Sequence, residues 1–567
     1  MIQTKLVSSL EKAMLEDSLD RFEALGRISA LKGERVSVQL LHTYRYEEGV
    51  GDVRRDDCAL TLEGDLASVA TVRDVCNVGV ERPVLPGIDE EEDYISLRPG
   101  LFPDVLRPLH AGNKVCCTAD LLLSVWVELA IPRDLAAGEH TLTLRLDGGV
   151  CGVCEETLTV EVIDAVLPEE SIYMTQWFHC DCLADYYGVE MWSERHWEIV
   201  ETFAKKAVER GVNLLLTPTF TPPLDTAVGG ERPTAQLVGV TKTGEDYSFD
   251  FTLLDRWVAM CDRIGVKYFE IAHFFTQWGA GHAPKVMATV DGVYQRIFGW
   301  DTDATGAEYS RFLRTFLQEF LAHMKKNGND KRCFFHVSDE PHLEHLESYR
   351  AAKAVVEDLL EGYVIMDALS NYEFYKMGVT KTPIPANNKI APFLEGQVPG
   401  LWTYYCCSQR KKVSNRLVAM PSWRNRSIGF QLYQYDIAGF LHWGYNFYYC
   451  WHSTDLINPF LQQDGDGWVP AGDAFSVYPA QDGTPWESLR LIVSHEALQD
   501  LRALRLCERY YGKEAVKALV DDEMGCKVTF DTCAKRAETI LGLRRKVNAM
   551  IAKAVAEGRT EGFDGAR

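Results

Sequence analysis

The sequence predicts a multidomain protein of the α/β and β classes, with an N-terminal β-sandwich, a central (β/α)8 TIM-like barrel and C-terminal helices. Three patterns along the chain predict this order. β-branched runs fill residues 27–168, apolar strand-like runs alternate with helical patterns over residues 171–487, and helical apolar stripes mark residues 488–567. A chain of 567 residues is also too long for one ordinary domain.

The N-terminal part has the texture of an all-β domain. We expect residues 1–26 to form a helical segment, followed by strands in runs such as RVSVQLLHTYR, LLLSVWVELAIP and ETLTVEVID. These runs are rich in β-branched residues, partly alternate, and are separated by Gly, Asp and Pro. Short strands at this spacing are typical of a sandwich.

The central part has the alternation expected of βα units. A helix is predicted over residues 308–326, where apolar residues recur at i, i+3 and i+4 and Gly328 follows as a stop signal. It leads into a short buried strand over residues 332–337. Further strands are predicted at residues 364–368, 389–393, 401–405 and 439–443. About eight such repeats over roughly 320 residues fit a (β/α)8 barrel with inserted loops.

The composition argues against some classes of partner. There are 59 basic and 82 acidic residues, and the formal charge of −23 argues against nucleic acids and other polyanions. No run approaches the ~20 apolar residues that span a bilayer, and the N-terminus lacks the apolar core of a signal peptide. Sixteen cysteines then indicate reduced thiols in a cytosol. We expect a cytoplasmic protein with no membrane or nucleic-acid partner, while the oligomeric state stays open.

Several cysteines and histidines are close in sequence, but their spacing does not match a metal site. Cys151 and Cys154 have no second pair nearby, and His179, His273 and His282 lack a matched arrangement. A structural zinc ion needs four convergent ligands. We therefore expect no metal and no cofactor.

The most informative segment is FFHVSDEP at residues 334–341, where an apolar strand ends in two acids and a proline. Pro341 biases Glu340 away from helical backbone angles, so the strand should present Asp339 and Glu340 at the C-terminal rim of the barrel, where catalysis is sited. Two crowded carboxylates cannot titrate alike, because one keeps its proton while the other stays ionised. Glycoside hydrolysis needs this division of labour.

Adjacent acids fit one variant of that chemistry better than the other. The ordinary retaining mechanism uses opposed carboxylates that flank the anomeric carbon. A 2-acetamido sugar can instead supply its own carbonyl as the nucleophile, so that one acid orients the acetamido N–H while its neighbour protonates the leaving oxygen. A structural alternative is that Asp339 caps a helix starting after Pro341, with Glu340 in solvent.

The SDEP strand end, the sandwich-then-barrel order and the segment GFLHWGYN at residues 439–446 resemble glycoside hydrolase family 123 and its wider relatives, known as domain of unknown function 4091. The resemblance runs from residues 101–104 to residues 488–490 and so covers most of the chain. It implies a β-N-acetylgalactosaminidase that retains configuration through an oxazoline intermediate formed by the substrate. By this resemblance, Asp339 orients the acetamido group and Glu340 is the general acid/base.

Sugar-binding groups are expected at the other strand ends, because aromatic faces stack on pyranose rings and polar groups bind hydroxyls. The candidates are His179, Asp225, Arg232, His273, Gln277, Trp278, His282, Asn371, Trp402, Tyr404, Trp443, Tyr445 and Asn446. The alternative for the aromatics is barrel core, and for Asp225 and Arg232 it is a loop ion pair.

The sequence thus favours an exo-acting glycosidase whose carbohydrate substrate ends in a β-linked 2-acetamido sugar, with N-acetylgalactosamine as the first choice. One alternative keeps the fold and changes the sugar to N-acetylglucosamine or another glycoside. The other is a non-catalytic carbohydrate-binding protein, against which the two acids argue.

Overall fold

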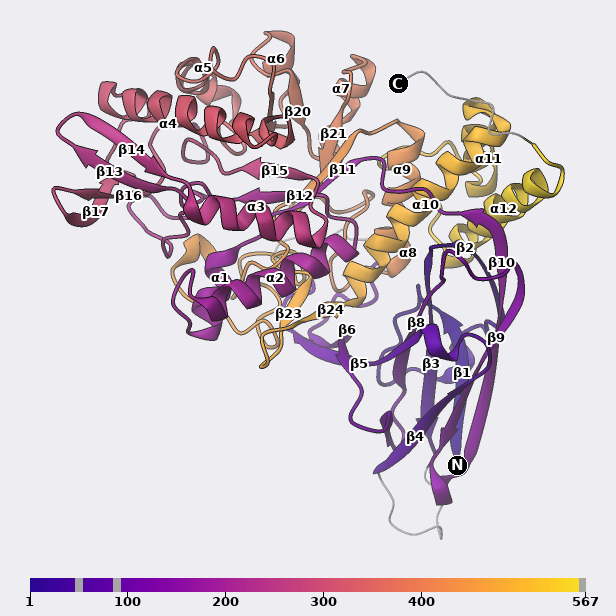
Figure 1. Ribbon diagram of the computed structural model, residues 1–567. Coiled ribbons are helices and arrows are strands. Elements are labelled where there is room, and N and C mark those ends of the chain that lie inside the picture. Colours follow the sequence, from indigo (N-terminus) through magenta and orange to yellow (C-terminus); the bar gives the residue numbers. More distant parts are fainter. Residues whose placement is uncertain (46–54, 85–92, 560–567) are drawn as a thin grey trace.

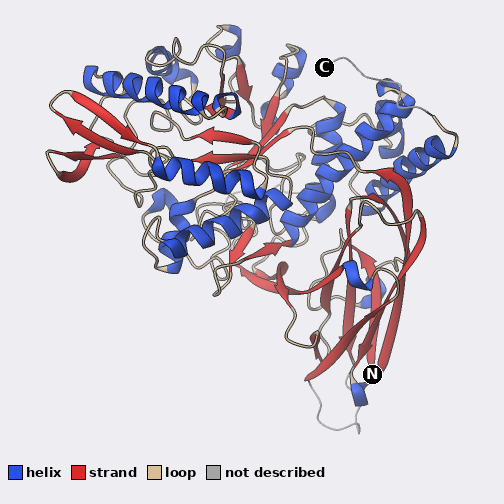
Figure 2. Ribbon diagram, in the orientation of Figure 1, coloured by secondary structure: helices blue, strands red, loops and turns tan. Residues whose placement is uncertain are grey.

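The computed structural model describes residues 1–45, 55–84 and 93–559 (Figure 1). The N-terminal sheets, in indigo and purple, form one lobe, and parallel strands with their helices form a second. The C-terminal helices, in yellow, lie beside both lobes. Colouring by secondary structure shows that the first lobe consists almost wholly of strands (Figure 2). The chain is therefore a mixed α/β protein with a strand-rich N-terminal region.

Two sheets make up the N-terminal lobe, in the orders β1-β3-β8-β5-β6-β24-β23 and β2-β10-β9-β4-β7. Their strands are β1 (Ile2–Ser8), β2 (Arg27–Lys32), β3 (Arg35–Tyr44), β4 (Arg55–Glu63), β5 (Ala70–Val80), β6 (Gly100–Pro108), β7 (Lys114–Thr118), β8 (Leu123–Ala130), β9 (Gly138–Asp147), β10 (Val153–Val166), β23 (Val477–Pro479) and β24 (Pro485–Ser488). Leu40 and Val127 of one sheet share a core with Leu144 and Val160 of the other, and all four are fully buried. Two sheets around one core are the arrangement of a sandwich.

The predicted helical segment over residues 1–26 is wrong. Residues Ile2–Ser8 form β1, which pairs antiparallel with β3 along its whole length, and a single 3-10 turn follows at Leu19–Arg21. Leu6 and Val7 of β1 belong to different hydrophobic clusters, so this strand is covered on both faces. Burial on both faces removes the polar–apolar alternation by which a strand is recognised in sequence.

The last strands of the large sheet come from far along the chain. β24 pairs antiparallel with β6, placing Glu487 opposite Leu106, and β23 pairs with β24. The pairing encloses Glu487 with Arg210, whose Nη2 donates to it at 3.1 Å, and with Glu128, which lies 2.9 Å from Nη1 of Arg210. The predicted end of the barrel at residue 487 thus falls inside a strand of the N-terminal lobe.

The second lobe contains a three-stranded and a five-stranded parallel sheet, in the orders β11-β22-β21 and β12-β15-β18-β19-β20. The strands are β11 (Tyr173–Gln176), β12 (Leu214–Thr217), β15 (Tyr268–Ile271), β18 (Cys333–Phe335), β19 (Val364–Ala368), β20 (Thr382–Ile384), β21 (Trp402–Tyr404) and β22 (Gly439–His442). Backbone hydrogen bonds also link the two sheets. Asn213 N–H donates to Met174 O at 3.1 Å, and Tyr404 N–H donates to Pro385 O at 3.2 Å.

Helices alternate with these parallel strands along the chain. They are α1 (Cys180–Tyr187), α2 (Glu194–Glu209), α3 (Thr252–Ile264), α4 (Ala307–Lys326), α5 (Leu346–Ala354), α6 (Tyr372–Lys376), α7 (Ala391–Glu395), α8 (Ser422–Arg426) and α9 (Ile428–Gln434). The prediction for α4 is confirmed to within one residue, and its buried face includes Tyr309, Phe312, Phe316 and Phe320 at helical spacing.

The strand predicted at residues 389–393 is wrong. These residues end a 3-10 turn and begin α7, while the strand lies earlier, at β20 (Thr382–Ile384), where it pairs with β19. Pro383 and Pro385 read as strand breakers in the sequence. β20 lies at the edge of its sheet, however, and the missing N–H of a proline there does not remove a hydrogen bond between strands.

Two hairpins and three helices complete the fold. The hairpins, β13 (Gly239–Thr243) with β14 (Asp246–Asp250) and β16 (Val286–Val290) with β17 (Val293–Phe298), join in one four-stranded sheet. The predicted C-terminal helices are α10 (Leu489–Tyr511), α11 (Lys513–Met524) and α12 (Ala537–Ala556), and the end of that prediction, residues 560–567, lies outside the described residues. Across the described chain, every helix is too short or too polar to cross a membrane.

Candidate active site

Asp339 and Glu340 lie on the chain that leaves β18. The strand itself covers only Cys333–Phe335, which is shorter than predicted, but backbone hydrogen bonds continue on both sides of it. Trp278 N–H donates to Asp339 O at 3.0 Å, and Glu340 N–H donates to Ala368 O at 3.1 Å. Segments that follow β15 and β19 therefore hold the two acids at the ends of the parallel strands.

Both acids line an open cavity of about 660 Å³. The structural alternative, in which Asp339 caps a helix, is not what the chain adopts. The helical elements that follow are capped by His342 and His345 instead. The acid pair is thus presented to a space that can hold a ligand.

The two carboxyl groups differ in their surroundings. Tyr404 Oη donates a hydrogen bond of 2.6 Å to Oε1 of Glu340. Oδ1 of Asp339 is enclosed and has no hydrogen-bond partner among the described residues. Burial, and then the charge of Glu340, raise the pKa of Asp339 well above its ordinary value, although His336 acts in the opposite direction. The surroundings therefore disfavour the ionised form of Asp339 in the unliganded cavity.

Three residues of the cavity wall have a left-handed backbone. The φ angles are 44° at Asp225, 57° at Trp278 and 44° at Glu340. Such conformations cost of order 1 kcal/mol or more at residues other than glycine, so the surrounding structure must enforce them. Strain of this kind clusters at functional sites.

A buried charged group lies beneath the acids. His336 Nε2 is 2.7 Å from Oε1 of Glu270, and its Nδ1 is 3.2 Å from Oδ1 of Asp367. Burial lowers the pKa of His336, but the hydrogen bonds and charges of Asp367 and Glu270 outweigh it and raise the pKa to about 9. Trp177 Nε1 donates to the same oxygen of Glu270 at 2.8 Å and so ties this floor to the cavity wall.

His273 stacks on His336, with ring centroids 4.2 Å apart and an angle of 21° between the rings. Neither ring nitrogen of His273 has a partner among the described residues, and burial lowers its pKa well below the usual value. With Asp367, the two histidines bring three donor atoms within 4.8 Å of one another. Nearly parallel rings direct their lone pairs side by side rather than toward one point, and His336 already serves two carboxylates. The cluster therefore fits a hydrogen-bonded floor better than a metal centre.

Aromatic side chains form much of the cavity wall. They are Trp177, Trp278, Tyr404, Trp443, Phe447 and Trp468. His179, Asp225 and Gln277 add polar groups to the same wall. Aromatic faces with a few polar groups suit a pyranose ring, whose C–H faces stack while its hydroxyls form hydrogen bonds.

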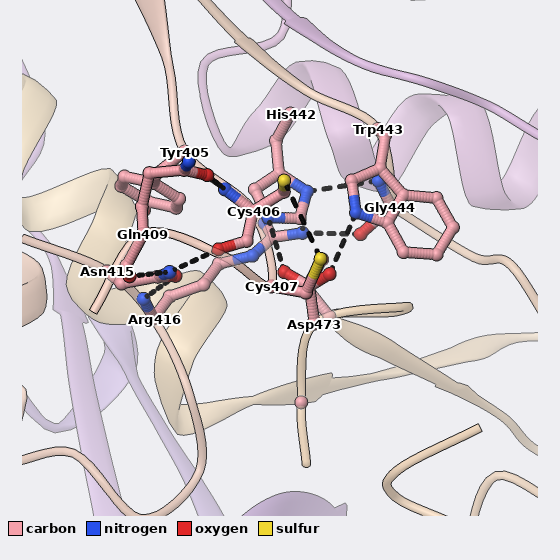
Figure 3. A network of polar contacts seen from close by, with 12 residues as sticks. Tyr405, Cys406, Cys407, Gln409, Asn415, Arg416, His442, Trp443, Gly444 and Asp473 are labelled. Carbon is pink, nitrogen blue, oxygen red and sulfur yellow. Dashed lines mark hydrogen bonds and ion pairs between the residues drawn. The ribbon is translucent and has the colours of Figure 1, made fainter. Parts of the chain in front are cut away.

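Asp473 fixes one side of this wall (Figure 3). Its Oδ2 accepts a hydrogen bond of 2.8 Å from Trp443 Nε1, and His442 Nε2 lies 3.5 Å from its Oδ1. Burial raises the pKa of Asp473 to about 6. The hydrogen bonds from Trp443 and from the backbone of Cys407, and the charge of Arg416, lower the pKa and only partly offset the burial. Asp473 thus joins the ends of β21 and β22 behind the cavity.

The structure brings together eight of the residues predicted for the site. Beside Asp339 and Glu340, the cavity is lined by His179, Asp225, Gln277, Trp278, Tyr404 and Trp443. Gln277 and Asp225 are also joined, because Asp225 N–H donates to Oε1 of Gln277 at 2.6 Å.

Two further predicted residues, Arg232 and Asn446, lie behind the wall. Arg232 forms a buried two-pronged pair with Asp181, at 2.8 and 2.9 Å, so it is not the partner of Asp225 in a loop ion pair. Asn446 accepts a hydrogen bond from His179 N–H at 2.9 Å and donates to His179 O at 3.1 Å. These contacts position His179 rather than a ligand.

The remaining predicted residues lie outside the cavity. His273 is in the floor, and Trp402 is buried among the parallel strands, stacked 5.3 Å from a tyrosine of β11. Tyr445 donates to a backbone carbonyl of α2 at 3.0 Å, and Asn371 caps α6. His282 forms an isolated backbone bridge away from the acids.

Sequence reasoning missed several residues at the site. They are Trp177, Leu224, Cys406, Cys407, Phe447 and Trp468 in the wall, and Asp473 behind it. Trp177 comes directly after β11, and Cys406 and Cys407 come directly after the strand predicted over residues 401–405, so strand-end position was a usable signal for them. Trp468 and Asp473 come from the loop between β22 and β23, and no sequence pattern places that loop over the cavity.

Comparison with known proteins assigns the family. The family described as "Glycoside hydrolase 123, catalytic domain" matches residues 177–507, more than half of the chain. A family 123 glycoside hydrolase from Clostridium perfringens, whose structure was analysed for glycolipid glycan hydrolysis, shares 13% identity at a TM-score of 0.72, with 98% of both chains covered. A putative glycoside hydrolase from Bacteroides vulgatus aligns over 84% of this chain and 78% of its own, at 10% identity and a TM-score of only 0.32. No curated protein matches the sequence. The chain belongs to glycoside hydrolase family 123.

Proposed function

We propose that this glycoside hydrolase is a retaining exo-β-N-acetylgalactosaminidase that uses the 2-acetamido group of its substrate as the nucleophile. One observation carries the proposal: two adjacent acids share an aromatic cavity, and Oδ1 of Asp339 is enclosed there without a partner. A buried acceptor that lacks a donor is costly, and the N–H of a bound acetamido group would satisfy it.

The adjacency of the acids favours this route over a protein nucleophile. A retaining enzyme with its own nucleophile places two carboxyl groups about 5–5.5 Å apart on opposite sides of the anomeric carbon. Asp339 and Glu340 are neighbours in the chain and approach from one side. The sugar carbonyl supplies the attack from the other side.

The proposed first step uses both acids. The acetamido oxygen attacks the anomeric carbon, the glycosidic C–O bond breaks, and Glu340 gives its proton to the leaving oxygen. Asp339 accepts the acetamido N–H and stabilises the positive charge of the oxazolinium ion. In the second step Glu340 takes a proton from water, which attacks the same carbon and restores the acetamido group with retained configuration.

The proposed first step requires a proton on Glu340 and an ionised Asp339 when substrate is bound. In the unliganded site, burial raises the pKa of Asp339 and so favours a proton on Asp339. An acetamido N–H that donates to Asp339 stabilises its ionised form. We propose that substrate binding thereby moves this proton to Glu340, so that the site becomes competent only around a 2-acetamido sugar.

The wall residues fit the rest of a terminal sugar. Oδ2 of Asp225 is enclosed and has no partner among the described residues, so it can accept from a sugar hydroxyl. Trp278 is 40% exposed and extends the aromatic wall to the rim, where an aglycone would leave the cavity. Because the Clostridium perfringens family member was analysed for glycolipid glycan hydrolysis, we propose glycans of glycolipids or other glycoconjugates as the substrate class.

The arrangement of the strands supports a (β/α)8 barrel as the catalytic scaffold. The parallel strands follow one another in chain order, with helices between them and hydrogen bonds across both gaps between the two sheets. We propose a sandwich domain over residues 27–168, to which β1, β23 and β24 add strands, a barrel within residues 171–487, and a C-terminal helical segment that begins at residue 488.

A panel of aryl glycosides tests the proposal. We expect hydrolysis of the chromogenic N-acetyl-β-galactosaminide, with the N-acetyl-β-glucosaminide turned over more slowly and the plain β-galactoside not at all. Equal activity on the plain galactoside would overturn the substrate-assisted scheme, and preference for the glucosaminide would keep the mechanism and change the sugar. Nuclear magnetic resonance of the first sugar released should show the β-anomer.

A further inference from the structure

Two cysteines that the proposed reaction does not use lie in the wall of the catalytic cavity. Cys406 and Cys407 lie one residue beyond the end of β21 and line the same cavity as Glu340 and Tyr404. Figure 3 shows the two cysteines side by side near Asp473. Their sulfur atoms are 3.9 Å apart, with the Cys407 thiol directed to Cys406 Sγ. A pair of thiols in this position is open to whatever enters the sugar site.

We propose that Cys406 and Cys407 form a thiol modification site in the catalytic cavity, where hydrogen peroxide converts the two thiols into a disulfide and thereby stops glycoside hydrolysis. The modification itself is independent of the sugar that the enzyme cleaves, whereas its effect on turnover rests on the proposed function. A second class of reagent for this pair of thiols is the thiol-specific arsenicals, which bind two neighbouring sulfurs.

The two thiols are suited to different steps. Cys407 is partly exposed, whereas Cys406 is only 9% exposed. The hydrogen bond with Cys407, and then burial, raise the pKa of Cys406 well above its ordinary value, so this thiol keeps its proton. Cys407 is therefore the sulfur that attacks peroxide, and Cys406 is the sulfur that resolves the product.

The chemistry balances with peroxide as the only co-reactant. The Cys407 sulfur attacks one oxygen of hydrogen peroxide, the O–O bond breaks, and a sulfenic acid and one water form. Cys406 sulfur then attacks the Cys407 sulfur, the S–O bond breaks, and the second water leaves with the thiol proton. Two thiols are oxidised by two electrons in all, and peroxide is reduced to two waters.

The disulfide would disturb the acid pair through the backbone. Adjacent Cα atoms stay about 3.8 Å apart across a trans peptide, below the usual range of about 4.4–6.8 Å for a disulfide. The bond therefore closes a strained ring and requires the backbone dihedral angles of residues 406 and 407 to change. Hydrogen bonds from Cys406 N–H to Gln409 at 2.8 Å and from Asn415 to Cys406 O at 2.8 Å now hold it in place. Tyr404, two residues earlier, carries the hydroxyl that bonds Glu340.

Another close pair shows that proximity of sulfurs is not enough for this role. Cys58 Sγ and Cys117 Sγ are 3.1 Å apart, but both residues are fully buried in the core between the N-terminal sheets. A reagent that enters the catalytic cavity has no route to them. We therefore expect peroxide that enters the cavity to form the disulfide at residues 406 and 407 and to leave Cys58 and Cys117 reduced.

Peptide mass mapping of the full chain tests the site without any substrate. After removal of reductant, mild peroxide treatment and blocking of free thiols with N-ethylmaleimide, the peptide with residues 406 and 407 should weigh two hydrogen atoms less and carry no maleimide. Dithiothreitol should restore both maleimide sites. Two blocked thiols in that peptide after treatment, or sulfinic acid in place of the disulfide, would overturn the proposal.

Inactivation kinetics test the consequence, with each variant compared with its own untreated activity. In Cys407→Ser the inactivation rate should fall about tenfold or more, because the attacking thiolate is gone. Cys526→Ser, which changes a partly exposed cysteine remote from the cavity, should lose activity as fast as the unmodified chain. An equal rate in Cys407→Ser would show that oxidation elsewhere inactivates the enzyme. A disulfide that forms without loss of turnover would overturn the proposed block of hydrolysis. If the enzyme is inactive on every glycoside, the proposed function is contradicted, and peptide mass mapping still decides whether the disulfide forms.

Discussion

Tyr404 and Glu340 are joined by a hydrogen bond of 2.6 Å between the phenol and Oε1, and this contact connects the end of β21 to the acid that follows β18. The contact orients the carboxyl that the proposed reaction uses as an acid in its first step and as a base in its second. Tyr404 therefore positions the proposed general acid/base.

Tyr404→Phe tests this positioning. Without the phenol the carboxyl of Glu340 is no longer held in one orientation, so kcat/KM should fall by about 10–100-fold. The measurement is kcat/KM on an aryl N-acetyl-β-galactosaminide. Tyr445→Phe is the matched control, because its hydroxyl bonds a carbonyl of α2 outside the cavity. An unchanged kcat/KM in Tyr404→Phe would exclude the positioning role.

Glu340→Gln should reveal general acid catalysis by its dependence on the leaving group. We expect kcat/KM to fall by about 10²–10⁴ on substrates with poor leaving groups, such as a natural glycan. Activated aryl glycosides, which need little protonation, should lose much less. Steady-state kinetics on a leaving-group series checks this, and an equal loss across the series would assign Glu340 another role.

Asp339→Asn should impair every 2-acetamido substrate alike. The amide cannot stabilise the oxazolinium charge, so kcat should fall by about 10²–10³ whatever the leaving group. A thiazoline analogue of the cyclised intermediate should also bind more weakly to the variant than to the unmodified enzyme, as isothermal titration can measure. Near-normal turnover in Asp339→Asn would contradict the assigned role.

The buried pair of Arg232 and Asp181 should matter for stability. Both side chains are almost fully buried, and Arg232→Met would leave the Asp181 carboxylate uncompensated, with a loss of about 3–5 kcal/mol. Urea denaturation followed by tryptophan fluorescence gives the difference. Arg256→Met breaks an exposed pair with Glu194 at 2.7 Å and should cost at most about 1 kcal/mol. Equal effects in the two variants would contradict this ranking.

Glu496 should make stability depend on pH. Burial raises the pKa of Glu496 from an ordinary 4.5 to about 7, although Arg426 lies 2.8 Å away. The folded chain then binds this proton more tightly than the unfolded chain, so the free energy of unfolding should fall as pH rises from about 4.5 to 7, by up to about 3 kcal/mol. Denaturation midpoints at several pH values, compared between the unmodified chain and Glu496→Gln, isolate this contribution. If the free energy of unfolding changes with pH equally in the unmodified chain and in Glu496→Gln, Glu496 is not the source of the dependence.

Much of the fold could be predicted because its signals are local. α4 was located by its apolar stripe, and β19 and β22 by short β-branched or apolar runs. β1 and β20 were not, since a strand buried on both faces and a three-residue strand with a proline inside it and another just after it lack the expected pattern. Their identity depends on partners elsewhere in the sequence.

Residues of the site could be predicted only where they lie at the ends of strands. Asp339 and Glu340 stand out because two acids end an apolar run, and Trp278 and Trp443 follow strands closely. Trp402 was expected at a strand end, but it begins β21 and stacks on Tyr173 in the strand core. Asp473 reaches the cavity through a long loop, and only the tertiary fold brings it there.

The pairing of β24 with β6 has a consequence for how the molecule can be made and dissected. The large sheet of the N-terminal lobe cannot be completed until residue 488 has been synthesised and has left the ribosome. Until then, β6 has an unpaired edge whose partner is made several hundred residues later. A fragment that stops at the end of the sandwich sequence would keep that edge exposed and would leave Arg73 without Glu487 and Glu128 without Arg210. Excised lobes of this enzyme should therefore aggregate where the intact chain does not.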